Sequence, residues 1–168
     1  MTGLSKVKPI LVLGIGNPLL SDDGVGLRLL ELTEQYFDEN DSTIEFLDGG
    51  TQGIALIGYL SERKSIIILD AVSNNQKPGT IHQLSGNDLL SYKSSKSTAH
   101  ESSATDIIKT ALLTGDLPES VSIIGIEPEK LNTSIGLSNT VDSKLKETIS
   151  IIIKKISLEK QNLVVSND

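Results

Sequence analysis

Three side chains in this sequence have the types and settings expected of a divalent metal site: Asp23, Asp70 and His100. Asp70 ends an apolar run with no basic residue beside it, and an ionised carboxylate so placed is costly unless it is hydrogen-bonded or bound to a metal. Two carboxylates and an imidazole suit a borderline ion such as Ni²⁺ or Zn²⁺. Because three protein ligands leave a coordination position open, such a site could be catalytic.

Each of these residues also has a purely structural explanation. Asp70 could accept hydrogen bonds from a neighbouring loop, and Asp23, like Asp22 beside it, could complement the dipole of a helix from its first turn. His100 lies in a loop rich in Ser and Lys and could be solvated. The other histidine, His82, alternates within an expected strand, which favours a structural role.

A dinucleotide site is suggested by the strand exit Gly14-Ile15-Gly16, but two positions oppose it. The third glycine of G-x-G-x-x-G would fall on Leu19, and Asp48 lies about thirty residues past Gly16 instead of about twenty. The motifs G-x-S-x-G and H-E-x-x-H are absent from the sequence. We therefore expect neither a nicotinamide cofactor nor a serine hydrolase or zincin mechanism.

The candidate acids follow short apolar runs that predict β-strands. Runs of this kind occupy residues 9–13, 44–47, 66–69, 80–84 and 121–126. The run 66–69 is apolar without alternation, which suits a central strand buried on both faces of a parallel sheet. Ligands of open α/β sheets bind beyond the carboxyl ends of the strands, so the acids at these exits are placed for a site.

Helical spacing separates these runs. One stripe consists of Val25, Leu29, Leu32 and Tyr36. Ser21 is its expected N-cap, and further helices are expected at 54–60, 104–113 and 140–156. This alternation predicts an α/β three-layer sandwich, in which a twisted, mostly parallel sheet of about five strands carries helices on both faces. We expect a single domain over 1–156 and a polar, flexible tail over 157–168.

Composition excludes several classes of protein. A chain of 168 residues corresponds to about one domain, and the lack of cysteine excludes disulfides, thiolate metal sites and a cysteine nucleophile. The balance of 15 basic and 22 acidic residues gives a net charge of −7 without a basic cluster, so nucleic acid is not an expected partner. The apolar stretch near the N-terminus is too short for a signal peptide or a membrane span, and we expect a cytoplasmic monomer without membrane contact.

Four segments, taken in order and spacing, resemble the hydrogenase maturation endopeptidases. They are LVLGIGNPLLSDDGVG, FLDGGTQG, IIILDAV and IGIEPE, with a loop histidine before the last, and the similarity extends over about 9–156. The resemblance implies that Asp23, Asp70 and His100 are the metal-binding and catalytic residues. Asp23 stands where the family commonly has Glu.

The resemblance further implies an endopeptidase that acts on the nickel-loaded precursor of a hydrogenase large subunit and removes its C-terminal extension. Nickel would arrive with the precursor, and zinc or another divalent ion could act as a surrogate. We expect Asn17 and the segment Asp48-Gly49-Gly50-Thr51 to bind the substrate, because glycines allow a chain to approach closely. Two alternatives stay open: a carboxylate-pair peptidase without metal, and a non-catalytic nickel-binding chaperone.

Overall fold

A five-stranded sheet with the strand order β2-β1-β3-β5-β4 forms the centre of the molecule. The computed structural model describes residues 7–92 and 103–165. The strands are β1 (Ile10–Ile15), β2 (Ile44–Gly50), β3 (Ser65–Ala71), β4 (Ile81–Ser85) and β5 (Ser120–Ile126). Four of them run parallel, and β4 joins the edge antiparallel to β5. The predicted mostly parallel sheet is confirmed, with each strand within a few residues of its predicted position.

The strand β3 lies in the middle of the sheet, as its unbroken apolar run predicts. All seven of its residues are buried. Its neighbours β1 and β5 place their last residues at the same rim, because Gly14 pairs with Leu69 and Gly125 pairs with Asp70. The rim at the carboxyl ends of these three parallel strands is therefore one continuous edge.

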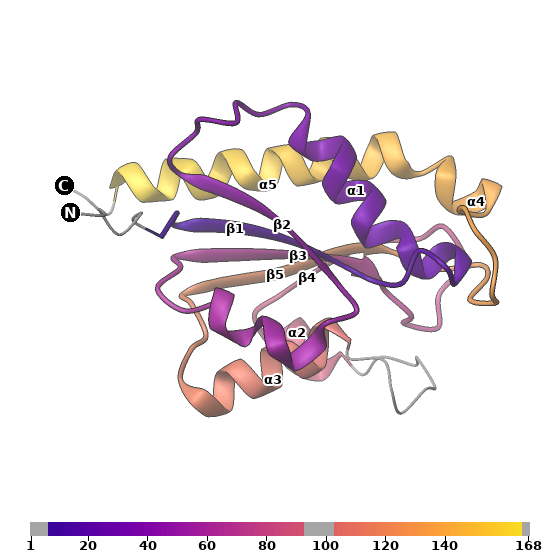
Figure 1. The fold of residues 1–168 in the computed structure, drawn as a ribbon, viewed down its shortest axis with the longest axis horizontal. Helices are drawn as coiled ribbons and strands as arrows, with labels where there is room; N and C mark the ends of the chain where they lie inside the picture. Colours follow the sequence, from indigo (N-terminus) through magenta and orange to yellow (C-terminus); the bar gives the residue numbers. More distant parts are fainter. Residues whose placement is uncertain (1–6, 93–102, 166–168) are drawn as a thin grey trace.

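Helices cover both faces of the sheet, so the three-layer arrangement is confirmed (Figure 1). One face is covered by α1 (Val25–Glu34) and α5 (Leu145–Val165). The other face carries α2 (Asn87–Ser91), α3 (Ala104–Thr114) and the 3-10 helix η2 (Gly53–Tyr59). Alternate residues of β1 supply the two cores: Val12 contributes to the first and Leu13 to the second. Both cores are mainly aliphatic.

The first helix begins later than its sequence suggests. Ser21 is not its N-cap: this residue has a φ of 50° and opens a short 3-10 turn, η1 (Ser21–Gly24), which precedes α1. The Ser21 hydroxyl donates to the carbonyl of Gly136 instead of capping a helix. Asp22 and Asp23 therefore lie in η1 and are buried there, instead of complementing the dipole of α1 from its surface.

The predicted helix end at Ile156 is also wrong, and residues 157–165 of the predicted flexible tail are helical. The segment 140–156 divides into α4 (Asn139–Asp142) and α5, and α5 continues to Val165. Its last turns are fastened to the sheet: the Ser120 hydroxyl donates to Glu159 at 2.9 Å, and Lys160 forms an ion pair with Asp41. The polar side chains of this segment bind Ser120 and Asp41, and a polar composition alone does not predict such contacts.

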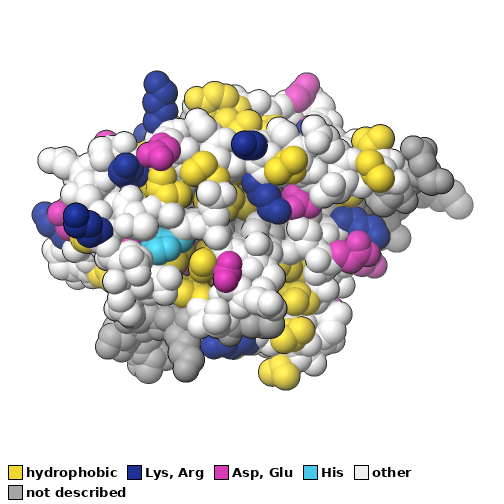
Figure 2. Space-filling view, turned by 180° about the vertical axis from the view of Figure 1, so that it is seen from behind, with side chains coloured by type: hydrophobic (Ala, Val, Ile, Leu, Met, Phe, Trp, Pro, Cys, Tyr) yellow, Lys and Arg dark blue, Asp and Glu magenta, His cyan; other side chains and the backbone are white. Residues whose placement is uncertain are grey.

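The described surface shows mixed charges. On the face opposite to that of Figure 1, Lys and Arg side chains are interspersed with Asp and Glu, and no single basic patch forms (Figure 2). None of the helices in the described ranges is both long enough and apolar enough to cross a membrane. The 21-residue helix α5 carries charged side chains along its length.

Candidate active site

The turn after β1 folds back tightly on itself and holds Asp23. Gly16, with a φ of 135°, has its Cα packed on Asp23, since a Cβ there would lie 1.9 Å from the Asp23 carbonyl oxygen. The amide of Asn17 then donates to Asp23 Oδ2 at 2.8 Å. Only glycine can occupy position 16 in this conformation without displacing the acid. Gly16 therefore positions the Asp23 carboxylate, whereas Gly14 lets α1 pack closely on β1.

Asp22 and Asp23 are adjacent and both buried, but they face different parts of the molecule. Asp22 accepts hydrogen bonds from the amides of Glu129, Lys130 and Ser138 at 2.7–2.9 Å, and from the Ser138 hydroxyl at 2.9 Å. Its carboxylate thus fastens the loop after β5 to η1. Asp23, which is 4% exposed, bonds to the turn after β1 instead.

Asp70 is the second-last residue of β3, and 3% of its surface is exposed. Its Oδ2 lies 3.5 Å from the amide of Ala104, the first residue of α3. A helix N-terminus has a positive partial charge and free N–H groups, and both attract a carboxylate. The beginning of α3 is itself closed by a capping box between Ser103 and Asp106.

The fold brings Asp23 and Asp70 to the same rim. Gly26, three residues past Asp23, is packed so closely that a Cβ would lie 2.3 Å from the carbonyl oxygen of Leu69, the neighbour of Asp70. The third predicted ligand, His100, lies outside the described residues and precedes Ala104 by four positions. Within the described ranges, no three side chains of the His, Cys, Asp or Glu type form a group that could hold a metal ion.

The predicted substrate-binding residues lie beside this rim. Asp48 is exposed and accepts a hydrogen bond from the amide of Gly50 at 2.9 Å. Gly49 is buried, and a Cβ there would lie 2.8 Å from Leu56, so this glycine lets η2 pack on the sheet. The Asn17 side chain accepts from the amide of Leu19 at 3.0 Å and shapes its own turn. Each of these contacts gives Asn17, Asp48 and Gly49 a local structural role. Asp48, the acid among the predicted substrate-binding residues, is also exposed to solvent.

The strand position predicted for His82 is confirmed. Its Nε2 lies 2.7 Å from Glu127 Oε2, and both side chains are buried. Glu127 also accepts from the amide of Asn74, which follows the β3 exit. The pair thus braces the backbone just past Asp70. The sequence analysis did not single out Glu127 as a site residue, although it lies within the segment IGIEPE, directly after β5.

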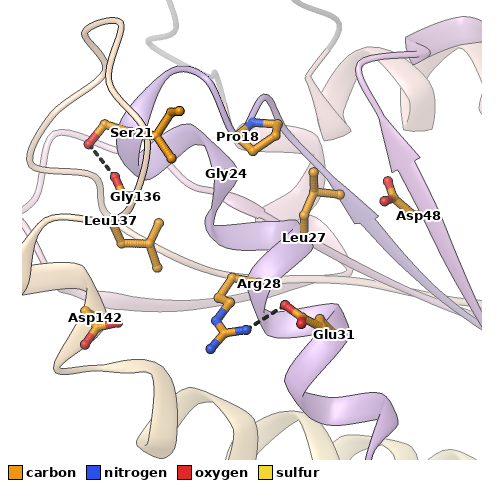
Figure 3. A pocket seen from close by; sticks show the side chains of 11 residues that line it. Pro18, Ser21, Gly24, Leu27, Arg28, Glu31, Asp48, Gly136, Leu137 and Asp142 are labelled. Carbon is orange, nitrogen blue, oxygen red and sulfur yellow. Dashed lines mark hydrogen bonds and ion pairs between the residues drawn. The ribbon is translucent and has the colours of Figure 1, made fainter.

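A pocket of about 580 Å³ lies next to the turn that holds Asp23 (Figure 3). Pro18, Ser21 and Gly24 line it at the turn after β1, and the α1 side chains of Leu27, Arg28 and Glu31 continue the lining. Asp48 stands at one side in Figure 3, and the loop before α4 closes the opposite side. Sequence reasoning did not identify this pocket, because its walls come from three separate segments of the chain.

Comparisons with known proteins agree on one family. The family model described as hydrogenase maturation protease matches residues 27–155. The hydrogenase 2 maturation protease of Escherichia coli K12 is 35% identical over 145 residues, which cover 86% of this chain and 88% of that protein. HupM of Azotobacter chroococcum mcd 1, a hydrogenase expression/formation protein, is 32% identical over 91% of this chain and 73% of its own length.

Solved structures give the same result. The hydrogenase maturating endopeptidase HybD from Escherichia coli superposes with a TM-score of 0.79 at 33% identity, and the match covers 89% of this chain and 93% of that one. The [NiFe] hydrogenase maturation protease HybD from Thermococcus kodakarensis has a TM-score of 0.63 at 27% identity, over 86% and 97% of the two chains.

Proposed function

Because the chain belongs to the hydrogenase maturation protease family, we propose that it cuts the C-terminal extension from a nickel-loaded precursor of a hydrogenase large subunit. Nickel enters this reaction as part of the precursor. The protein contributes Asp23, Asp70 and His100 as the groups that meet it. Zinc or another divalent ion could replace nickel as a probe of the site.

The observation that carries this proposal is the burial of Asp23 and Asp70 at the carboxyl rim of the sheet. The two acids are 4% and 3% exposed; Asp23 follows β1, and Asp70 lies near the end of the neighbouring parallel strand β3. Burying two carboxylates near each other is costly unless a cation or several N–H groups compensate their charge. Oxygen ligands of this kind fit a divalent ion, and His100 would add an imidazole to the set.

The chain's own residues account for the steps that peptide cleavage needs. The carboxylates of Asp23 and Asp70 hold the nickel-carrying end of the precursor, which fixes the adjacent peptide bond in one orientation. One of the two accepts a proton from the attacking water and returns it to the leaving amine. Asp48 and the glycines after it lie at the same rim and bind the backbone that follows the cut.

The test compares nickel-loaded with nickel-free precursor, and mass spectrometry measures the fragment lost. Wild-type protein should shorten only the loaded form. Asp23→Asn and Asp70→Asn should each slow cleavage by about a hundred-fold or more, because a general base alone contributes that much. Glu39→Gln, which changes an exposed acid away from the rim, is the matched control and should cleave at the wild-type rate.

Other results would replace this mechanism. Equal cleavage of both precursor forms would rule out recognition of nickel. Activity that survives both His100→Ala and a chelator would favour a carboxylate-pair peptidase. Binding of the precursor with no change in its mass would identify a chaperone instead of an enzyme.

A further inference from the structure

The 3-10 turn η1 lines the pocket and also carries Asp23 of the proposed active site. Ser21 and Gly24 line the pocket, and Asp23 lies between them in the sequence with its side chain bonded toward the turn after β1. The pocket and the rim are thus two sides of one 3-10 turn.

The pocket wall opposite Asp48 is the loop before α4, and hydrogen bonds hold this loop to η1. Ser21 donates through its hydroxyl to the carbonyl of Gly136 at 3.1 Å and through its amide to the carbonyl of Ser134 at 2.8 Å. The four hydrogen bonds to Asp22 hold the same loop from behind. Because the loop is fastened to the turn that carries Asp23, the pocket keeps a constant position relative to the proposed active site.

The pocket has an apolar middle and acidic sides. Leu27, Ile135 and Leu137 supply the apolar surface, and 87% of Ile135 is exposed. The only cation among the lining residues, Arg28, is engaged by Glu31 at 2.6 Å. Asp48 and Asp142 then leave the pocket with excess negative charge, and neither forms an ion pair with any residue that the structure describes.

We propose that this pocket binds the C-terminal extension of the precursor, the part that is cut away. The inference rests on the function proposed above. An apolar side chain of the extension lies against Leu27 and Leu137, and a Lys or Arg of the extension faces Asp142, on the side opposite Asp48. The volume, about 580 Å³, is within the range of ligand-binding pockets and fits one short stretch of the extension.

Charge favours a peptide over a second copy of this chain as the occupant. The protein has a net charge of −7, so two copies that meet at an acidic pocket would repel each other. A segment with a basic residue is attracted to the same surface. The pocket therefore selects precursors by the sequence that follows the cut, independently of the nickel ion.

Two substitutions test the pocket, each with a matched control. Ile135→Glu places a charge on its apolar wall, and Leu113→Glu makes the same change at a leucine that is equally 87% exposed on α3. Asp142→Lys reverses a pocket charge, and Glu34→Lys reverses an exposed charge at the end of α1. Both pocket variants should raise KM for the nickel-loaded precursor by about ten-fold and leave kcat within about two-fold. Both controls should match the wild type.

A direct binding measurement accompanies the kinetics. A fluorescein-labelled synthetic peptide with the sequence of the extension should bind wild-type protein, as followed by anisotropy, and should bind each pocket variant about ten-fold more weakly. Precursor truncated at the cleavage site should bind the variants and the wild type equally. Added salt should weaken binding of the labelled peptide to the wild type more than to Asp142→Lys.

The outcomes separate the two proposals. If wild-type protein does not cut the loaded precursor, the proposed function fails. If it does cut, but KM and peptide affinity are unchanged in Ile135→Glu and Asp142→Lys, the pocket assignment alone is overturned. Sedimentation of the wild type as a dimer that Ile135→Glu converts to a monomer would also overturn it, because a second copy would then be the occupant.

Discussion

Asp22 and Asp23 are adjacent in the sequence but bond to different parts of the molecule. Asp22 is fully buried and accepts four hydrogen bonds from the loop after β5, whereas Asp23 faces the turn after β1. A carboxylate satisfied by three amides and a hydroxyl has little capacity left for a metal ion. The geometry therefore assigns the anchoring role to Asp22 and leaves Asp23 for the proposed chemistry.

Replacing Asp22 tests this assignment by stability. Asp22→Ala leaves the amides of Glu129, Lys130 and Ser138 without their acceptor, and buried groups that lose a partner cost about 1–3 kcal/mol each. We expect the free energy of unfolding in urea to fall by about 3 kcal/mol or more. Glu39→Ala, an exposed change, should stay within about 0.5 kcal/mol. An unchanged urea midpoint in Asp22→Ala would mean that the loop is held by other contacts.

At the scale of elements, the end of α5 is fastened to the sheet by charged side chains. Burial alone would raise the pKa of Asp41, but hydrogen bonds from Lys160 and Thr43 outweigh it and lower the pKa from 3.8 to about 2. Burial likewise opposes the lowering of the Glu159 pKa, which hydrogen bonds from Lys155 and Ser120 produce. Lys160 also lies 5.3 Å from the centre of the Phe37 ring.

These shifts predict how stability depends on pH. A lowered pKa in the folded state stabilises the fold above the unfolded values of 3.8 and 4.5, and this contribution is lost as the pH falls through the folded values. Asp41→Asn should therefore be less stable than the wild type near neutral pH by about 1 kcal/mol, since solvent screens this surface pair. The difference should vanish between about pH 5 and about pH 2, as followed by urea unfolding. A difference that persists at the acid end would exclude ionisation of Asp41 as its cause.

At the scale of the whole molecule, the two cores depend on the same strands. Leu11 and Leu13 of β1 belong to the core beneath α3 and η2, whereas Ile10 and Val12, which alternate with them, belong to the core beneath α1 and α5. Neither helical layer can lose its core without exposing a strand that the other layer also covers. The architecture therefore favours unfolding as one cooperative unit.

Hydrogen exchange of a core variant tests this cooperativity. Leu11→Ala opens a cavity beneath α3 and should destabilise the protein by about 2–5 kcal/mol. If unfolding is cooperative, the slowest-exchanging amides of α5, on the other face, should lose as much protection as those of α3. Loss confined to α3 would show that the two layers open separately.

Local patterns in the sequence predicted the five strands, most of the helices and the rim. Apolar runs predicted the five strands, and the non-alternating run predicted the central place of β3, because burial on both faces requires apolar residues in succession. Asp23 and Asp70 were identified because strand exits of parallel sheets converge at one edge. The four motif segments predicted the family that the comparisons confirm.

Contacts between segments far apart in the sequence determined the features that local patterns did not predict. Asp22 meets Ser138 across 116 positions, and Ser21 meets Gly136 across 115, so no local pattern could reveal the anchor, the late start of α1 or the pocket that these contacts enclose. The continuation of α5 past Ile156 likewise depends on Ser120 and Asp41, which bind the polar side chains there. A residue's type and spacing determine which strand or helix it can join, whereas its partners are determined only when the chain has packed.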